Sequence, residues 1–200
     1  MQRGVGHYTR KGLGGAVTAA RRMGGASVTA GGLYNALTDL AGGDTAADGR
    51  LDRNVLQGTT AGQVIAAIVE AVSPVDGTQD VEASRDAIQD SLSQLLTDFP
   101  DADLLALTNE QRWLVVEGYL ACDIYNRIML DVGKAIQEKA PTSTVALQRL
   151  KDVKDYVRET VSARLNKLHA KGAEVTQKRM GEIIRATVTE TFEVFESYAE

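Results

Sequence analysis

From about residue 60 onward, apolar residues recur every three to four positions, the period of a helix with one buried face. In the first such stretch Ile65, Ile68, Val69 and Val72 keep this spacing, and Pro74 ends it because proline disfavours helix in the residue before it. The later stripes are Val81, Ile88, Leu92, Leu95 and Leu96; Trp113, Val116, Leu120, Ile124 and Ile128; Leu147, Leu150, Val157, Val161, Leu165 and Leu168; and Met180, Ile184, Val188, Phe192 and Phe195. No strand-like alternation persists anywhere, so the pattern predicts an all-α fold.

Local signals support the starts of two of these helices. Thr60 and Gln63 have the spacing of a capping box, in which each side chain pairs with the backbone amide of the other residue, and Thr108 and Gln111 repeat that spacing. The second box opens a long stretch without proline, which we expect to be a central helix packed on more than one side. Its predicted core residues are Trp113, Leu120, Ile124 and Ile128.

These patterns predict an antiparallel helical bundle of about seven helices, with a glycine-rich helical arm at the N-terminus. Short connections between the last helices favour antiparallel packing. We expect a division into a glycine-rich basic arm and loop (1–58) and an acidic helical body (59–200). The predicted helices span residues 8–23, 27–41, 60–73, 78–97, 108–138, 143–170 and 174–198, which is about three quarters of the chain.

The arm differs from the body in composition. Of the 19 glycines, 14 lie within the first 62 residues, and each glycine weakens a helix by about 1 kcal/mol relative to alanine. Leucines at positions 33, 37 and 40 nevertheless keep helical spacing. We therefore expect residues 1–42 to be a docking element that packs on the acidic body or on a partner, with glycines that allow close backbone approach.

Charge is also uneven along the chain. The chain has a formal net charge of −5, yet residues 1–38 hold five basic and no acidic residues. The remaining residues carry 17 basic and 27 acidic side chains, a net charge of −10. An acidic body disfavours nonspecific binding to nucleic acid, which depends on neutralising phosphates.

Four basic residues of the arm form two pairs 11 positions apart, so the pairs share one face if the helix between them is continuous. A solvated face, a docking surface for an acidic protein and a nucleic-acid contact all remain open, and the salt dependence of binding separates the last two. The predicted partner-binding residues are Arg10, Lys11, Arg21, Arg22, Gly24, Gly31, Leu33 and Leu37.

Nothing in the sequence assembles a catalytic, metal or cofactor site. Asp44, Asp48 and Gly49 match part of a calcium-binding loop, but the carboxylates needed at two other positions are missing. The glycines beside Arg10 and Lys11 lack the strand and the lysine-serine pair of a nucleotide-binding loop. The single cysteine, Cys122, excludes an internal disulfide, and we expect it to be a buried structural thiol. Without a long apolar run, we expect a cytoplasmic protein and no membrane contact.

Several blocks of the chain resemble the QatB family, the second protein of the Qat anti-phage defence system. The N-terminal blocks are Gly6-His7-Tyr8 through Arg10-Lys11-Gly12, Ala19 through Gly25, and Thr29-Ala30-Gly31-Gly32-Leu33-Tyr34. The later blocks are Val75-Asp76-Gly77-Thr78, Ser84-Arg85-Asp86-Ala87, Asp103 through Thr108, Arg127-Ile128-Met129 and Asp131-Val132-Gly133. Together they cover roughly residues 5–160.

The resemblance implies a non-enzymatic component that acts beside an ATPase (QatA), a QueC-like enzyme (QatC) and a TatD-like nuclease. It further implies that the chain is a protein partner of the QueC-like enzyme and its substrate for modification at the N-terminus. Members of the family begin with Met-Gly and a proline-rich extension, whereas this chain begins with Met1-Gln2-Arg3. We therefore expect the native N-terminus to be missing and assign no modified residue. The alternative is a nucleic-acid-binding accessory protein that uses the basic patch.

Overall fold

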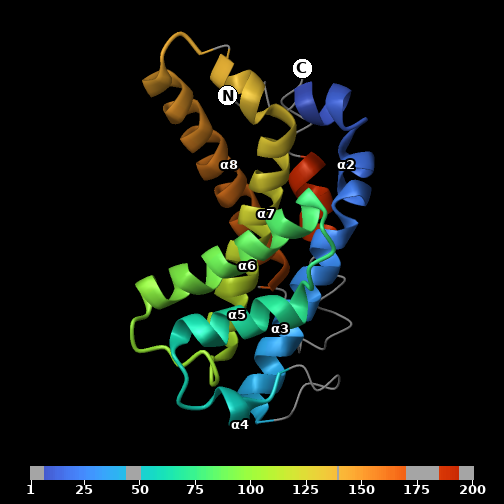
Figure 1. Ribbon diagram of the computed structural model, residues 1–200. Helices are drawn as coiled ribbons and strands as arrows, with labels where there is room; N and C mark the ends of the chain where they lie inside the picture. The colour runs from blue at the N-terminus through green and yellow to red at the C-terminus, as the bar shows by residue number, and fades with distance from the viewer. Residues whose placement is uncertain (1–6, 44–50, 139, 170–184, 194–200) are drawn as a thin grey trace. The chain divides into compact units, whose positions relative to one another are not determined.

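The computed structural model describes residues 7–43, 51–138, 140–169 and 185–193, and it contains helices and no strand within these ranges. The all-α fold predicted from the sequence is therefore confirmed (Figure 1). The elements are a short π-helix η1 (Tyr8–Gly12) and the α-helices α2 (Ala16–Arg22), α3 (Gly24–Gly42), α4 (Arg53–Leu56), α5 (Ala61–Val72), α6 (Gln79–Asp98), α7 (Asn109–Glu138) and α8 (Ser143–His169). Residues 185–193 are also helical.

The described chain divides into two compact units. Unit 1 consists of Met1–Ser27 and Ala121–Glu200, and unit 2 consists of Val28–Leu120. Helices α3 and α7 each contribute residues to both units, because the boundaries fall inside them. The division at residue 58, which rests on composition, stays a prediction.

Both predicted capping boxes form. Each threonine amide donates to the glutamine side chain at 2.9 Å, at Thr60 and Gln63 and again at Thr108 and Gln111. The reverse bonds, from the glutamine amides to the threonine hydroxyls, measure 3.3 and 3.2 Å. These bonds satisfy amides that the first turn of a helix leaves without partners, and they fix where α5 and α7 begin.

In unit 2, α5 and α6 lie side by side and antiparallel (Figure 1). The first part of α7 approaches α6 closely, because a Cβ at Gly118 would lie 3.3 Å from the Cβ of Ser91. One turn of α7 presents Tyr119, whose hydroxyl is 2.6 Å from the hydroxyl of Ser84 on α6, and both side chains are buried. The packing of these helices thus includes a satisfied polar contact as well as apolar burial.

In unit 1, the second part of α7 contacts α8, and α8 contacts the helical residues 185–193. The Lys154 ammonium lies 5.8 Å from the centre of the Tyr125 ring, and Arg164 on α8 is 3.4 Å from Glu190. Val188 and Phe192 are 1% and 0% exposed, so the part of the predicted C-terminal stripe that the structure describes is buried as expected. The other members of that stripe, Met180, Ile184 and Phe195, lie outside the described residues.

The core of α7 is also as predicted. Trp113, Leu120, Ile124 and Ile128 are all no more than 6% exposed. Their spacing of seven, four and four residues places them on one side of the helix, which is the reason that the periodicity alone was sufficient to find them.

The predicted helix over residues 8–23 is not continuous. It is interrupted at Leu13–Gly15, where Gly14 and Gly15 have φ angles of 81° and 94°. This left-handed region is open to glycine and costly for other residues, so the glycine pair permits the break between η1 and α2. The condition under which the two basic pairs would share one helical face, a continuous helix between them, is therefore not met.

Candidate functional site

The four cations predicted to bind a partner are exposed. Arg10 and Lys11 lie in the last turn of η1, and Arg21 and Arg22 lie in the last turn of α2. Cations at a helix C-terminus interact favourably with the carbonyl groups there. The same side chains remain available to an outside partner, which keeps them as candidates.

A tyrosine that the sequence analysis did not single out links η1 to α7. The Tyr8 hydroxyl donates a hydrogen bond to the carboxylate of Asp131, 123 positions later in the chain. The ring lies back over η1, where a Cβ at Gly12 would come within 2.8 Å of Tyr8 Cδ2. Burial, with the hydrogen bond and charge of Asp131 as the next causes, raises the pKa of the Tyr8 hydroxyl, while Arg22 acts in the opposite direction. The hydrogen bond between Tyr8 and Asp131 therefore joins the start of the arm to α7 within unit 1.

We expect Tyr8→Phe to destabilise the protein by about 0.5–1.5 kcal/mol at neutral pH, because it removes this hydrogen bond. The pKa of Tyr8 is raised in the folded state, so its contribution is complete below the unfolded pKa of about 10 and is lost as the pH rises further. Urea unfolding from pH 7 to above 10 should therefore show a steeper alkaline loss for the wild type than for the variant. Parallel curves for the two proteins would contradict the assignment.

Gly24 and Gly31 face open space within the chain. A Cβ built at either residue, or at Gly25, meets no atom within 4 Å other than the helix's own backbone. Close packing against another described residue of this chain is therefore not the reason for these glycines. The other expected reason for these glycines is close approach by the backbone of a partner protein. Gly24 and Gly31 therefore stay in the candidate site.

Leu33 and Leu37 must be removed from the predicted partner-binding set. Both are 0% exposed, because α3 uses this face to pack within unit 2. The neighbouring Tyr34 donates to Asn109 Oδ1 at 2.9 Å, and its ring centre is 6.0 Å from that of Trp113 on α7. This part of the arm is docked on helices of the predicted body, so its leucines belong to the core.

A buried ion pair on α7 also escaped the sequence analysis. The Asp123 side chain is 0% exposed and its Oδ2 lies 2.8 Å from Nε of Arg127, whose side chain is 11% exposed. The two residues are four positions apart, which places them on the same side of the helix. The sequence indicates the pair only through an acid and a base four residues apart among apolar residues. Exposed helix faces show the same pattern, so the pattern does not predict burial. We assign the pair a structural role within unit 1.

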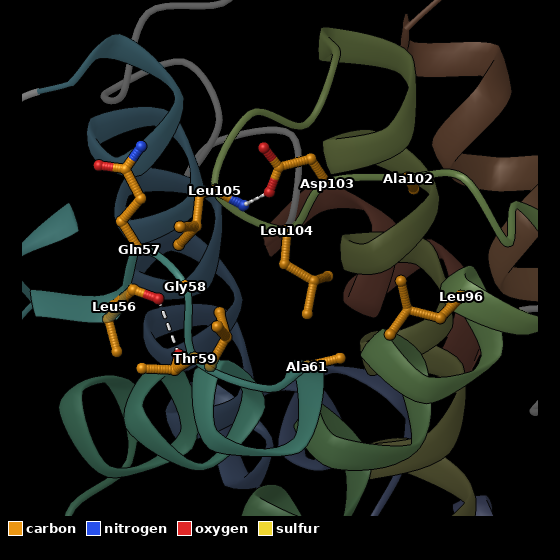
Figure 2. Close-up of a pocket in the computed structure, with 11 residues that line it drawn as sticks. Leu56, Gln57, Gly58, Thr59, Ala61, Leu96, Ala102, Asp103, Leu104 and Leu105 are labelled. Atoms are coloured by element: carbon orange, nitrogen blue, oxygen red, sulfur yellow. Dashed lines mark hydrogen bonds between the residues drawn. The ribbon is translucent and has the colours of Figure 1, made fainter. Parts of the chain in front are cut away.

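Unit 2 contains a cavity of about 240 Å³ between the α4–α5 connection and the α6–α7 connection. Figure 2 shows its lining, with Leu96 and Leu104 among the side chains around the space and Asp103 at its edge. One Asp103 oxygen accepts the amide of Leu105 at 2.9 Å. The described residues that line it are Leu56, Gln57, Gly58, Thr59, Ala61, Val64, Leu96, Ala102, Asp103, Leu104 and Leu105. The cavity has an apolar floor and a carboxylate at its edge.

Other candidate chemistry receives no support from the geometry. Cys122 is half-buried rather than buried, since it lies between the core side and the outer side of α7. Asp44, Asp48 and Gly49 lie outside the described residues. Across the parts of the chain that the structure describes, no three histidine, cysteine, aspartate or glutamate residues gather as metal ligands would. The same parts include no helix that combines the length and the apolar character needed to cross a bilayer.

Comparison with known families gives one match. A family model described as "Qat anti-phage system associated protein QatB" matches residues 14–195. No curated protein and no solved structure matches the chain.

Proposed function

This chain belongs to the QatB family of the Qat anti-phage system, and we propose that it acts there as a non-enzymatic protein partner of a QueC-like enzyme (QatC). We further propose that it is the substrate that this enzyme modifies at the N-terminus. The ATPase of the system (QatA) is a second candidate partner. These roles are what the family resemblance implies, and the described residues are compatible with them.

The observation that carries the proposal is the open face at the junction of α2 and α3. Gly24 and Gly25 are exposed, Val28 is 75% exposed, and a Cβ at Gly31 meets no neighbour. Glycine in a helix costs stability relative to alanine, and no contact with another described residue compensates for it here. The backbone of a partner protein could approach this face closely, because the glycines have no side chains that would keep it away.

We expect Gly24→Val/Gly31→Val to lower capture by the QueC-like enzyme several-fold, because the added side chains hold the partner backbone away. The fold should be unaffected, since no side chain or backbone atom of the described residues, apart from the helix's own backbone, lies within 4 Å of either new Cβ. Arg21→Gln/Arg22→Gln should have a smaller effect, because exposed charges are screened by salt. The measurement is a pull-down of the purified protein with each Qat component at two salt concentrations.

Gly62→Val is the matched control, because Gly62 is exposed on α5 and a Cβ there also meets no neighbour. It should bind like the wild type. If the arginine variant loses binding while the valine variant keeps it, the arm is an electrostatic tether and the packing account is wrong. The intact mass of the protein, measured after incubation with the enzyme, tests the role as a modification substrate.

Incubation of the protein with duplex and single-stranded DNA at the same two salt concentrations distinguishes the partner role from the alternative, a nucleic-acid-binding accessory protein. Tight binding that weakens steeply with salt, without any protein complex, would favour a nucleic-acid-binding accessory. The acidic body argues against that outcome, since its 23 acidic residues repel the phosphate backbone.

A further inference from the structure

The surface of unit 2 carries a net negative charge. Residues 54–120 hold eleven aspartates and glutamates and only two basic residues, Arg85 and Arg112. Both arginines are engaged within the unit: Arg85 binds Glu70 at 3.0 Å, and Arg112 donates to the Leu107 carbonyl at 2.7 Å. All the acids except Glu117 are exposed. Unit 2 therefore favours a positively charged partner.

The cavity of unit 2 opens within this acidic surface. Asp103 lines it, and Asp98 and Asp101 are exposed on the same α6–α7 connection. Leu56, Leu96 and Leu104 give it an apolar floor. Its volume of about 240 Å³ accepts an apolar side chain of the size of valine or leucine. The chemistry that fits is an apolar side chain with a cation close by.

Helix α2 presents that combination on its outer side. Val17 is 65% exposed, although Ala16 and Ala19 on the other side of the same helix are buried. Arg21 follows Val17 by four residues, one helical turn or about 6 Å along the axis, and is exposed. An arginine side chain spans that distance, so a carboxylate beside a pocket filled by Val17 is within its reach.

We infer that Val17 of one copy of this chain docks in the cavity of a second copy, with Arg21 against Asp103 at its edge. Charge complementarity selects this occupant, because α2 lies in a segment with no acidic residue and the cavity lies in a segment of strong negative charge. The contact is heterologous, because one copy contributes Val17 from its unit 1 and the other copy contributes the cavity of its unit 2. A contact this small gives weak association. The inference stands apart from the proposed enzyme partner.

Sedimentation velocity of the whole chain over a range of concentrations tests the inference. At roughly 0.05 M salt the average mass should rise with concentration above that of the 21.4 kDa monomer. At roughly 0.5 M salt, where the Debye length falls to about 4 Å, the association should weaken several-fold. A wild type that stays monomeric at low salt, or whose mass does not depend on concentration, overturns the inference.

Substitutions at the cavity separate the apolar contact from the charge. Ala61→Leu fills the cavity, and Val17→Ser removes the docking side chain; each should weaken association by about tenfold or more. Asp103→Asn should weaken association less, because it removes the charge that faces Arg21 but leaves the apolar contact of Val17 in place. The loop should keep its shape, since the amide oxygen still accepts the bond from Leu105. Ala66→Leu and Asp90→Asn are the controls, because both residues are exposed and neither lines the cavity. Equal effects from the cavity variants and their controls would overturn the assignment.

Mixing two variants gives the sharpest test. Copies with Val17→Ser keep the cavity, and copies with Ala61→Leu keep the docking valine, so each alone should stay monomeric while an equimolar mixture forms heterodimers. Damage to the fold is not repaired by mixing, and this readout therefore isolates the docking contact. A mixture that remains monomeric while both variants retain the helical circular dichroism of the wild type contradicts the proposed pair of surfaces.

Discussion

Replacing Asp123 by alanine should destabilise the protein by about 3–5 kcal/mol, measured by urea unfolding. The reason is the burial of the pair: the Asp123 side chain is 0% and that of Arg127 is 11% exposed. The substitution removes the carboxylate that accepts from Nε of Arg127 and leaves a cation in surroundings with little water. Asp123→Asn keeps an acceptor and should cost less.

The same helix supplies a matched control for this prediction. Lys134 and Glu138 are also four residues apart, but their side chains are 87% and 65% exposed and their charged atoms are 3.7 Å apart. Glu138→Ala should therefore cost less than about 1 kcal/mol. The double variant Asp123→Ala/Arg127→Met should recover part of the loss, because it removes the buried cation. Equal costs for Asp123→Ala and Glu138→Ala would show that burial does not determine the effect.

Replacing Leu37 by alanine should cost about 2–5 kcal/mol of unfolding free energy. Leu37 is 0% exposed in unit 2, so the substitution removes apolar contacts and leaves a cavity. This prediction also tests the assignment of Leu37 to the core rather than to a partner site. A partner-contact residue would instead lower complex formation and leave stability unchanged.

Val28→Ala on the same helix is the comparison, because Val28 is 75% exposed. It should change the unfolding free energy by no more than about 0.5 kcal/mol. Circular dichroism during thermal unfolding is sufficient to rank the two variants. A loss for Leu37→Ala that is as small as the loss for Val28→Ala would return Leu37 to the candidate docking surface.

Periodicity and capping were sufficient to predict those helices of the body that the structure describes. The capping boxes at Thr60 and Thr108 fix the starts of α5 and α7, and the apolar spacing identifies the buried side of α7. Both signals act over three or four residues, so a single sequence contains them. The basic residues of the arm were likewise recognised from composition, and the structure leaves Arg21 and its neighbours exposed.

Features that depend on distant residues were not predictable in this way. The Tyr8 to Asp131 bond joins residues 123 positions apart, and no local pattern marks either partner. The break at Gly14 needed knowledge of φ, since a glycine pair also occurs inside α3 without interrupting it. Leu33 has the spacing of a buried stripe, but the sequence does not say whether the chain or a partner covers it. Tertiary packing decides each of these cases.

The division into units has a consequence for the order in which the chain is made. Unit 1 combines Met1–Ser27 with Ala121–Glu200, whereas Val28–Leu120 is continuous. During synthesis the first 27 residues must therefore wait for a segment that begins 94 positions later, a delay of about 5–20 s at the usual rate of translation. Unit 2 has its full sequence before then. The start of the arm is thus accessible on the ribosome before its own unit can close.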